Sequence, residues 1–142
     1  LLEEALISTA NTYQIDGHVN KEFFTSEDMQ QTNTPSYDFT PWKDLKSLCF
    51  NLIKGKRTPL FFKFVLHLKP EAVGKLLAAG ACSLPPEQIK ALVLTIKYDG
   101  TQAVLTTGSS YHTFVMSKEP DVIWDKALQQ FLNKQEIAYE LL

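Results

Sequence analysis

The sequence lacks the features that mark several large classes of protein. Its six glycines (positions 17, 55, 74, 80, 100 and 108) stand singly, so neither a GxGxxG nor a GxxxxGK phosphate-binding loop occurs. A GxSxG nucleophile elbow is also absent. No apolar run approaches the ~20 residues that a membrane-spanning helix needs. We therefore expect no phosphate loop, no serine-hydrolase elbow and no membrane segment.

Positive and negative charges nearly balance in this sequence. Fourteen Lys and Arg residues oppose sixteen Asp and Glu residues, for a formal net charge of −2. This balance disfavours a dedicated nucleic-acid binder. The two cysteines, Cys49 and Cys82, lie among apolar residues, and we interpret them as reduced and buried, with a disulfide as the alternative. Such usage favours a reducing cytoplasm.

The spacing of apolar residues predicts strands in both halves of the chain. A strand over 6–15 is followed by Asp16-Gly17, which is typical of a tight hairpin turn, and by a return strand over 18–24. Residues 25–36 are polar and predict a flexible loop. A strand over 60–68 has a wholly apolar face that should point at the core, formed by Leu60, Phe62, Phe64, Leu66 and Leu68. A meander follows over 91–98, 101–107 and 111–117, with turns at 99–100 and 108–110.

Three helices are predicted by apolar residues at helical spacing. The first begins near Thr40-Pro41, with Thr40 as its N-cap, and ends at Gly55. The second runs from Pro70 to Gly80, and the third begins at Pro120 with a buried stripe formed by Ile123, Trp124, Ala127, Leu128, Phe131 and Leu132. The order β-β-α-β-α-β-β-β-α, with tight turns between consecutive strands, predicts an α+β fold. We expect a mainly antiparallel sheet with about three helices packed on it.

The residues that most often perform catalysis or hold metals form no recognisable pattern. The three histidines, His18, His67 and His112, fall on predicted strands without the spacing of metal ligands, so we predict no metal and no cofactor. Ser110 and His112 lie two residues apart, and we interpret them as part of a turn in preference to a nucleophile and its base.

The most suggestive local feature is a cluster of four cations, which we call the basic corner: Lys54, Lys56, Arg57 and Lys63. These side chains could bind a phosphate or carboxylate of a ligand or partner. The alternative is structural, because cations favour a helix C-terminus and protect sheet edges. With His67 on the same predicted strand as Lys63, these residues are our candidate binding site.

Four stretches resemble a family of small proteins of unknown function from anaerobic Gram-positive bacteria: TYQIDGHVNKEFF (12–24), LIKGKRTPLFFKFVLHL (52–68), TTGSSYHTF (106–114) and WDKALQQFL (124–132). The resemblance covers nearly the whole chain and carries over no catalytic residues. It implies a further strand and helix ahead of Leu1, so we expect residues 1–142 to be a single domain that lacks its first strand and helix. With that pair added, the order of elements is similar to the repeating unit of DNA sliding clamps.

Three functional hypotheses follow. The absence of a recognisable reaction site favours a non-catalytic cytoplasmic binding or interaction module, with a homodimer or a protein partner as its contact. The second hypothesis is an enzyme whose site is assembled from scattered residues, with Arg57, Lys63, His67 and His112 as the first candidates. The third is a clamp-like nucleic-acid accessory protein that uses the basic corner, which the balanced charge disfavours.

Overall fold

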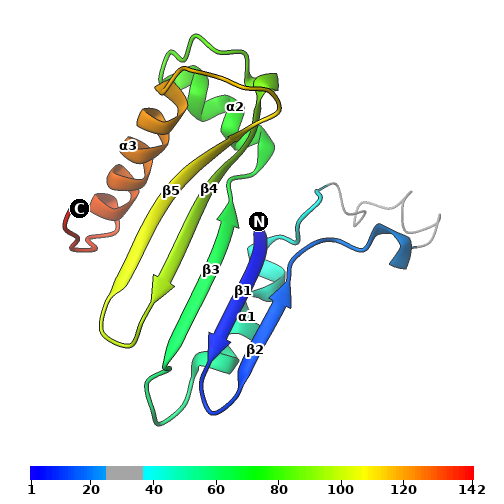
Figure 1. Ribbon diagram of the computed structural model, residues 1–142, viewed down its shortest axis with the longest axis vertical. Coiled ribbons are helices and arrows are strands. Elements are labelled where there is room, and N and C mark those ends of the chain that lie inside the picture. Colours follow the sequence, from blue (N-terminus) through cyan, green and yellow to red (C-terminus); the bar gives the residue numbers. More distant parts are fainter. Residues whose placement is uncertain (25–36) are drawn as a thin grey trace. The chain divides into compact units, whose positions relative to one another are not determined.

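The structure is a computed structural model that describes residues 1–24 and 37–142 (Figure 1). Its described strands form one sheet in the order β2-β1-β3-β4-β5, and the described α-helices are α1, α2 and α3. The predicted α+β class, with an antiparallel sheet and three helices, is confirmed. No described helix has the length and apolar character needed to cross a membrane.

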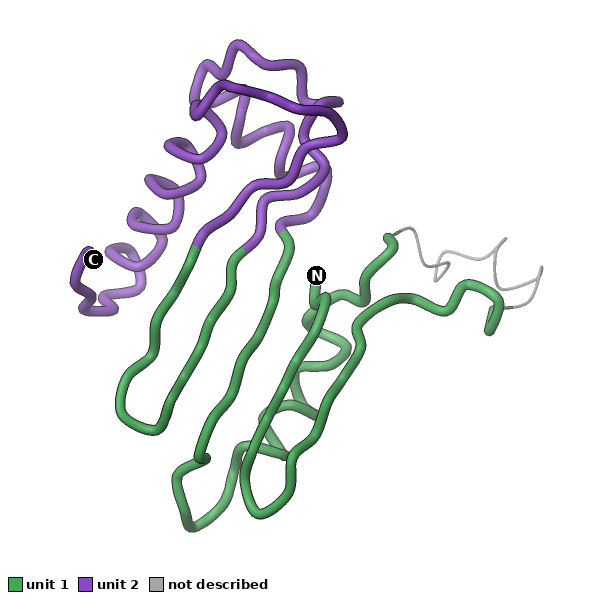
Figure 2. Tube along the Cα trace, in the orientation of Figure 1, with its two compact units in different colours: residues 1–67, 94–106 green, residues 68–93, 107–142 purple. Residues whose placement is uncertain are grey.

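The chain divides into two compact units (Figure 2). Unit 1 comprises residues 1–67 and 94–106, and unit 2 comprises residues 68–93 and 107–142. Strands β4 (Ile89–Tyr98) and β5 (Ala103–Tyr111) each contribute residues to both units. Whether residues 1–142 behave as a single domain stays a prediction.

Strand β1 (Leu2–Ser8) is the centre of unit 1. It pairs antiparallel with β2 (Thr12–Asp16) on one side and with β3 (Phe61–His67) on the other. Helix α1 (Trp42–Ile53) contributes apolar side chains to the core beside β1. The buried members of this core are Leu2, Ala5, Ile7, Cys49 and Phe64. The predicted inward position of Phe64 is therefore confirmed, whereas the prediction for Leu60 was wrong, because this residue precedes β3 and is 70% exposed.

The first hairpin turns earlier than the sequence predicts. The predicted strand over 6–15 is two strands, and the chain reverses at residues 9–11 between the hydroxyls of Ser8 and Thr12, which lie 2.6 Å apart. Ile7, Tyr13 and Ile15 stay in phase at period two across this turn, which hides it from a test of periodicity. The prediction of a hairpin turn at Asp16-Gly17 was wrong. Asp16 ends β2, and Gly17 is buried beside the backbone of Leu2.

The predicted return strand over 18–24 was also wrong. His18 forms only an isolated bridge with Phe39, and residues Lys21–Phe23 form a short 3-10 helix, η1. A strand there would need a neighbour along its whole length, and only residues 38–40 pair with this part of the chain among the described residues. The predicted loop over 25–36 lies outside the described residues.

Helix α1 begins one residue later than predicted. Pro41 occupies the N-cap position, because the hydroxyl of Thr40 donates to the carbonyl of Gly17 at 3.0 Å and does not cap the helix. That bond ties the start of α1 to the end of β2.

Unit 2 is built from helices α2 (Pro70–Ala79) and α3 (Glu119–Lys134), the short 3-10 helix η3 (Pro86–Gln88) and parts of β4 and β5. Its buried core comprises Val73, Leu77, Ile89 and Leu92. The indole Nε1 of Trp124 donates to the carbonyl of Val93 at 2.8 Å and so ties α3 to β4. Phe131, predicted to be buried, is 55% exposed, whereas its neighbour Leu132 is 7% exposed, so the last turn of α3 buries one side only.

Strand β5 replaces two predicted strands. The predicted turn at 108–110 lies inside β5, and the chain leaves the strand after Tyr111, so the predicted strand over 111–117 does not form. The hydroxyls of Thr107 and Ser109 donate to Asp125 and Asp121 of α3. Alternate residues of a strand and residues four apart on a helix can match in this way, and the contacts hold an otherwise turn-like sequence extended.

Both cysteines are free thiols, so the alternative of a disulfide is wrong. Cys49 is buried as predicted, whereas Cys82 is partly exposed. Cys82 lies after the C-terminus of α2, where its side chain packs only against the margin of the unit 2 core.

Candidate functional site

The structure separates the residues of the predicted binding site. Lys54, Lys56 and Arg57 are exposed in and after the last turn of α1, and none of them forms an ion pair with another described residue. Lys63 lies on β3, where its Nζ is 4.0 Å from Oε2 of Glu4. His67 is four residues further along β3, roughly 13 Å away at the usual rise of a strand. Lys63 and His67 therefore lie on the same strand but do not contact each other.

A bulge in β1 explains why two consecutive carboxylates reach β3. Leu2 pairs with Leu66 but Glu4 pairs with Val65, so Glu3 is an extra residue between two positions of the ladder. Successive side chains of a regular strand point to opposite faces. Because the bulge interrupts this alternation, Glu3 contacts His67 while Glu4 contacts Lys63.

A row of three rings, each tilted against the next by 59° or 49°, joins residues 18, 39 and 67 of unit 1. The ring of Phe39 has its centroid 4.6 Å from that of His67 and 4.6 Å from that of His18. His67 Nε2 lies 3.2 Å from Oε1 of Glu3, and His18 Nδ1 lies 2.8 Å from Oδ1 of Asp16. Each imidazole thus has one carboxylate partner. We call this set the histidine stack.

Two opposing effects act on the pKa of His67. Desolvation lowers the pKa of His67 below its ordinary value of 6.5, and the neighbouring Glu3 carboxylate acts in the opposite direction. At Asp16, hydrogen bonds from the His18 backbone and ring lower the pKa of the carboxyl group. A neutral imidazole with an oriented tautomer can act as a base. His112, a further residue of the enzyme hypothesis, belongs to unit 2, and no described group of His, Cys, Asp and Glu could hold a metal ion.

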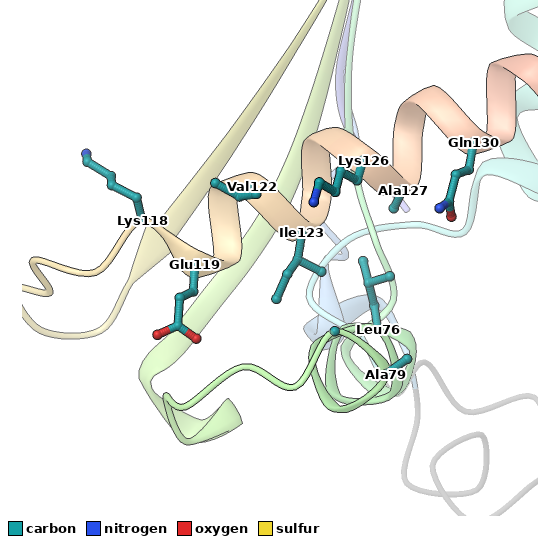
Figure 3. Close-up of a pocket in the computed structure, with 10 residues that line it drawn as sticks. Leu76, Ala79, Lys118, Glu119, Val122, Ile123, Lys126, Ala127 and Gln130 are labelled. Atoms are coloured by element: carbon teal, nitrogen blue, oxygen red, sulfur yellow. The ribbon is translucent and has the colours of Figure 1, made fainter.

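A hollow surface lies in unit 2, between α2 and α3 (Figure 3). It has a volume of about 630 Å³, and we call it the α2–α3 groove. Figure 3 shows Ile123 pointing from α3 toward α2 and Leu76 pointing from α2 toward α3. The residues that line it are Leu76, Ala79, Gly80, Lys118, Glu119, Val122, Ile123, Lys126, Ala127 and Gln130.

Small residues keep the groove open at its base. Ala79, Gly80 and Ala127 occupy positions where longer side chains would fill the space between the helices. Gly80 marks a close approach of the two helices, since a Cβ atom there would lie 2.8 Å from Cδ1 of Ile123. The helices thus touch near Gly80, and the surface beside this contact is left uncovered.

The acidic and basic side chains around the groove differ in whether they already have a partner. Glu119 is already engaged, because its Oε2 accepts from the Ser83 backbone N–H at 2.9 Å and its Oε1 from the Ser83 hydroxyl at 2.6 Å. These bonds hold the pKa of Glu119 below its ordinary range. Lys118 and Lys126 form no ion pair with any residue that the structure describes. The groove therefore combines an apolar floor with two available cations on its α3 side.

The sequence predicted both helices but not the groove. The apolar stripes of α2 and α3 are visible as helical periodicity, whereas Ala79, Gly80 and Ala127 look like ordinary helix and helix-end residues. The sequence feature that could have indicated the groove is the combination of small residues on α2 and α3 with the lysines of α3. This signal has meaning only once the two helices are known to be neighbours.

Comparison with known proteins identifies relatives by family alone. No curated protein and no solved structure matches the chain. The sequence profile of a family of unknown function, DUF5721, matches residues 1–140. Because this match covers nearly the entire chain, the protein belongs to the family of unknown function DUF5721.

Proposed function

We propose that the protein is a non-catalytic interaction module of the bacterial cytoplasm, and that it binds a segment of a partner protein in the α2–α3 groove. The observation that carries the proposal is the groove itself. It is an apolar concave surface with two cations that have no ion-pair partner among the described residues. The source in anaerobic Gram-positive bacteria, implied by the sequence resemblance, is part of the same proposal.

The form of the groove favours a polypeptide over a small molecule. A small ligand is usually enclosed, with about 70–90% of its surface buried. Here Ala79, Val122, Lys126 and Gln130 are exposed, so the groove is open along its length. Val122, an apolar side chain, is 48% exposed. An open apolar surface with a polar rim is typical of a contact with another protein.

The histidine stack supports a catalytic role less well. Each imidazole is matched to a carboxylate and to the ring of Phe39, and the same contacts attach residues 38–40 to the ends of β1 and β2. This attachment by itself accounts for the positions of the two imidazoles, without a catalytic role. They are not accompanied by a nucleophile in the described part of unit 1 that is hydrogen-bonded to either ring.

Two neighbouring alanines of α2 provide a matched test. Ala79 lines the groove and Ala78 does not, yet both are exposed on the same helix. A photo-crosslinking amino acid placed at each position in the source organism should attach a discrete partner at 79 and none at 78. The partner should then be purified and titrated by calorimetry against the wild-type protein, Ala79→Trp and Ala78→Trp.

We expect Ala79→Trp to weaken binding at least about tenfold, since the indole occupies the space of the partner's anchoring side chain. Ala78→Trp should bind like the wild type. Exposed positions tolerate such changes within roughly 0.5 kcal/mol of stability, so both variants should melt near the wild-type temperature. Equal affinities for the two variants would remove the groove as the binding surface.

A further inference from the structure

We propose that the segment bound in the α2–α3 groove is an amphipathic helix with two carboxylates about two turns apart along one edge. This inference rests on the function proposed above and specifies its partner. The carrying observation is the juxtaposition of an apolar floor, formed from two helices, with Lys118 and Lys126 along one wall.

The walls of the groove favour a helix. Side chains on two packed helices form ridges and grooves into which the side chains of a third helix can fit. Its apolar residues at positions i, i+3 or i+4, and i+7 would contact Leu76, Ile123 and the open space above Ala127. The small side chains at Ala79 and Ala127 allow a backbone to approach closely.

The positions of the cations select acidic residues. Lys118 is the N-cap residue of α3 and Lys126 lies eight residues further on, roughly 12 Å along the helix axis. Carboxylates seven residues apart on a helix lie within about 20° of each other around its axis and roughly 10.5 Å apart along it. Glu119, the acidic residue that lines the groove, is held by Ser83, so it leaves both lysines available.

The helices of this chain do not offer such an edge, which favours a different protein over a second copy. Helix α1 has Asp44 as its single acidic residue, and α2 has only Glu71. In α3, three acidic side chains are present, and each accepts a hydrogen bond from a serine or threonine within the chain. A second copy would therefore bring no pair of available carboxylates on a described helix.

Three synthetic helical peptides test the inference. Each has about 16 residues and the same leucine stripe, and the two edge positions about seven residues apart carry Glu, Gln or Lys. The wild-type protein should bind the Glu peptide roughly 2- to 30-fold more tightly than the Gln peptide, which is the range expected for two exposed ion pairs. Binding should follow the order Glu, Gln, Lys, and the differences should shrink at high salt.

Charge reversal supplies the decisive comparison. The double variant Lys118→Glu/Lys126→Glu should prefer the Lys peptide, whereas Lys97→Glu, at an exposed position of β4 in unit 1, should keep the wild-type order. Equal binding of the Glu and Gln peptides, or an unchanged order in the double variant, would overturn the acidic helix.

The same peptides separate this inference from the function on which it rests. If Ala79→Trp weakens all three peptides equally and no charge preference exists, the groove is a docking site but its partner is not acidic. If Ala79→Trp leaves every affinity unchanged, the interaction surface itself is wrong. A dimer by light scattering that Ala79→Trp converts to a monomer would assign the groove to a second copy and overturn the inference.

Discussion

Gly17 should be the glycine at which an added methyl group costs most. The residue is buried, and a Cβ atom there would lie 1.8 Å from the carbonyl oxygen of Leu2 and 2.7 Å from its carbonyl carbon. Ordinary contact begins near 3.4 Å, so the two backbones would have to separate by about 1.6 Å. Both obstructing atoms belong to the backbone, which cannot rotate away as a side chain can.

The hydrogen bonds that surround Gly17 set the magnitude of the loss. Its N–H donates to the carbonyl of Glu3 at 2.8 Å, and its carbonyl accepts from the N–H of Thr40 at 2.8 Å. The N–H of Leu2 in turn donates to Thr40 at 2.8 Å. Three such bonds contribute about 0.5–1.5 kcal/mol each, and forced overpacking adds about 1–3 kcal/mol. We expect Gly17→Ala to lower the free energy of unfolding by about 2.5–7.5 kcal/mol, a large part of the ~5–15 kcal/mol typical of a domain.

Gly74 provides a control with the opposite sign. It lies within α2, and a Cβ atom there would meet nothing within 4 Å. Because alanine favours a helix interior over glycine, Gly74→Ala should raise the free energy of unfolding by roughly 0.5–1 kcal/mol. Urea denaturation followed by far-UV circular dichroism measures both variants. The reasoning would be refuted if Gly17→Ala unfolded within about 1 kcal/mol of the wild type.

Two further predictions concern the histidine stack and the attachment of α3. Because burial lowers the pKa of His67 below 6.5, its contribution to stability is complete above pH 6.5 and is lost as the pH falls through the lower pKa of the folded state. Glu3→Gln removes the charge that opposes this shift, so NMR titration should give a His67 pKa below 6.5 in the wild type and lower still in the variant. A wild-type pKa at or above 6.5 would contradict the role of burial. Trp124→Phe removes the hydrogen bond to Val93, and we expect a loss of about 1–2 kcal/mol in urea denaturation. An unchanged unfolding midpoint would mean that the bond adds nothing beyond the packing of the ring.

Residue spacing predicted which segments are helical because that information is local. The stripes of α1, α2 and α3, and the prolines that open α2 and lie near the start of α3, determine periodicity and φ angles within a few neighbouring residues. The antiparallel class followed from the number of short connections between strands. These features depend little on what each segment packs against.

Predictions based on turn chemistry failed where distant contacts override it. Asp16-Gly17 has the composition of a hairpin turn, but Gly17 is needed where the backbone of Leu2 passes within contact distance. Residues 108–110 look like a turn and are instead held extended by the carboxylates of α3. In both cases the deciding partner lies more than ten residues away, and a local pattern carries no information about it.

The candidate binding residues also show which properties are local to the sequence and which depend on tertiary contacts. The sequence by itself determined the chemistry of Lys63 and His67 and placed both on β3. Only the tertiary structure decided that a bulge at Glu3 gives each of them its own carboxylate, whereas Lys54, Lys56 and Arg57 form no ion pair with a described residue. Likewise, the α2–α3 groove exists only as the space between two helices joined by about forty residues of chain. A one-dimensional pattern specifies the faces of such helices, whereas packing determines which faces meet and which are left open.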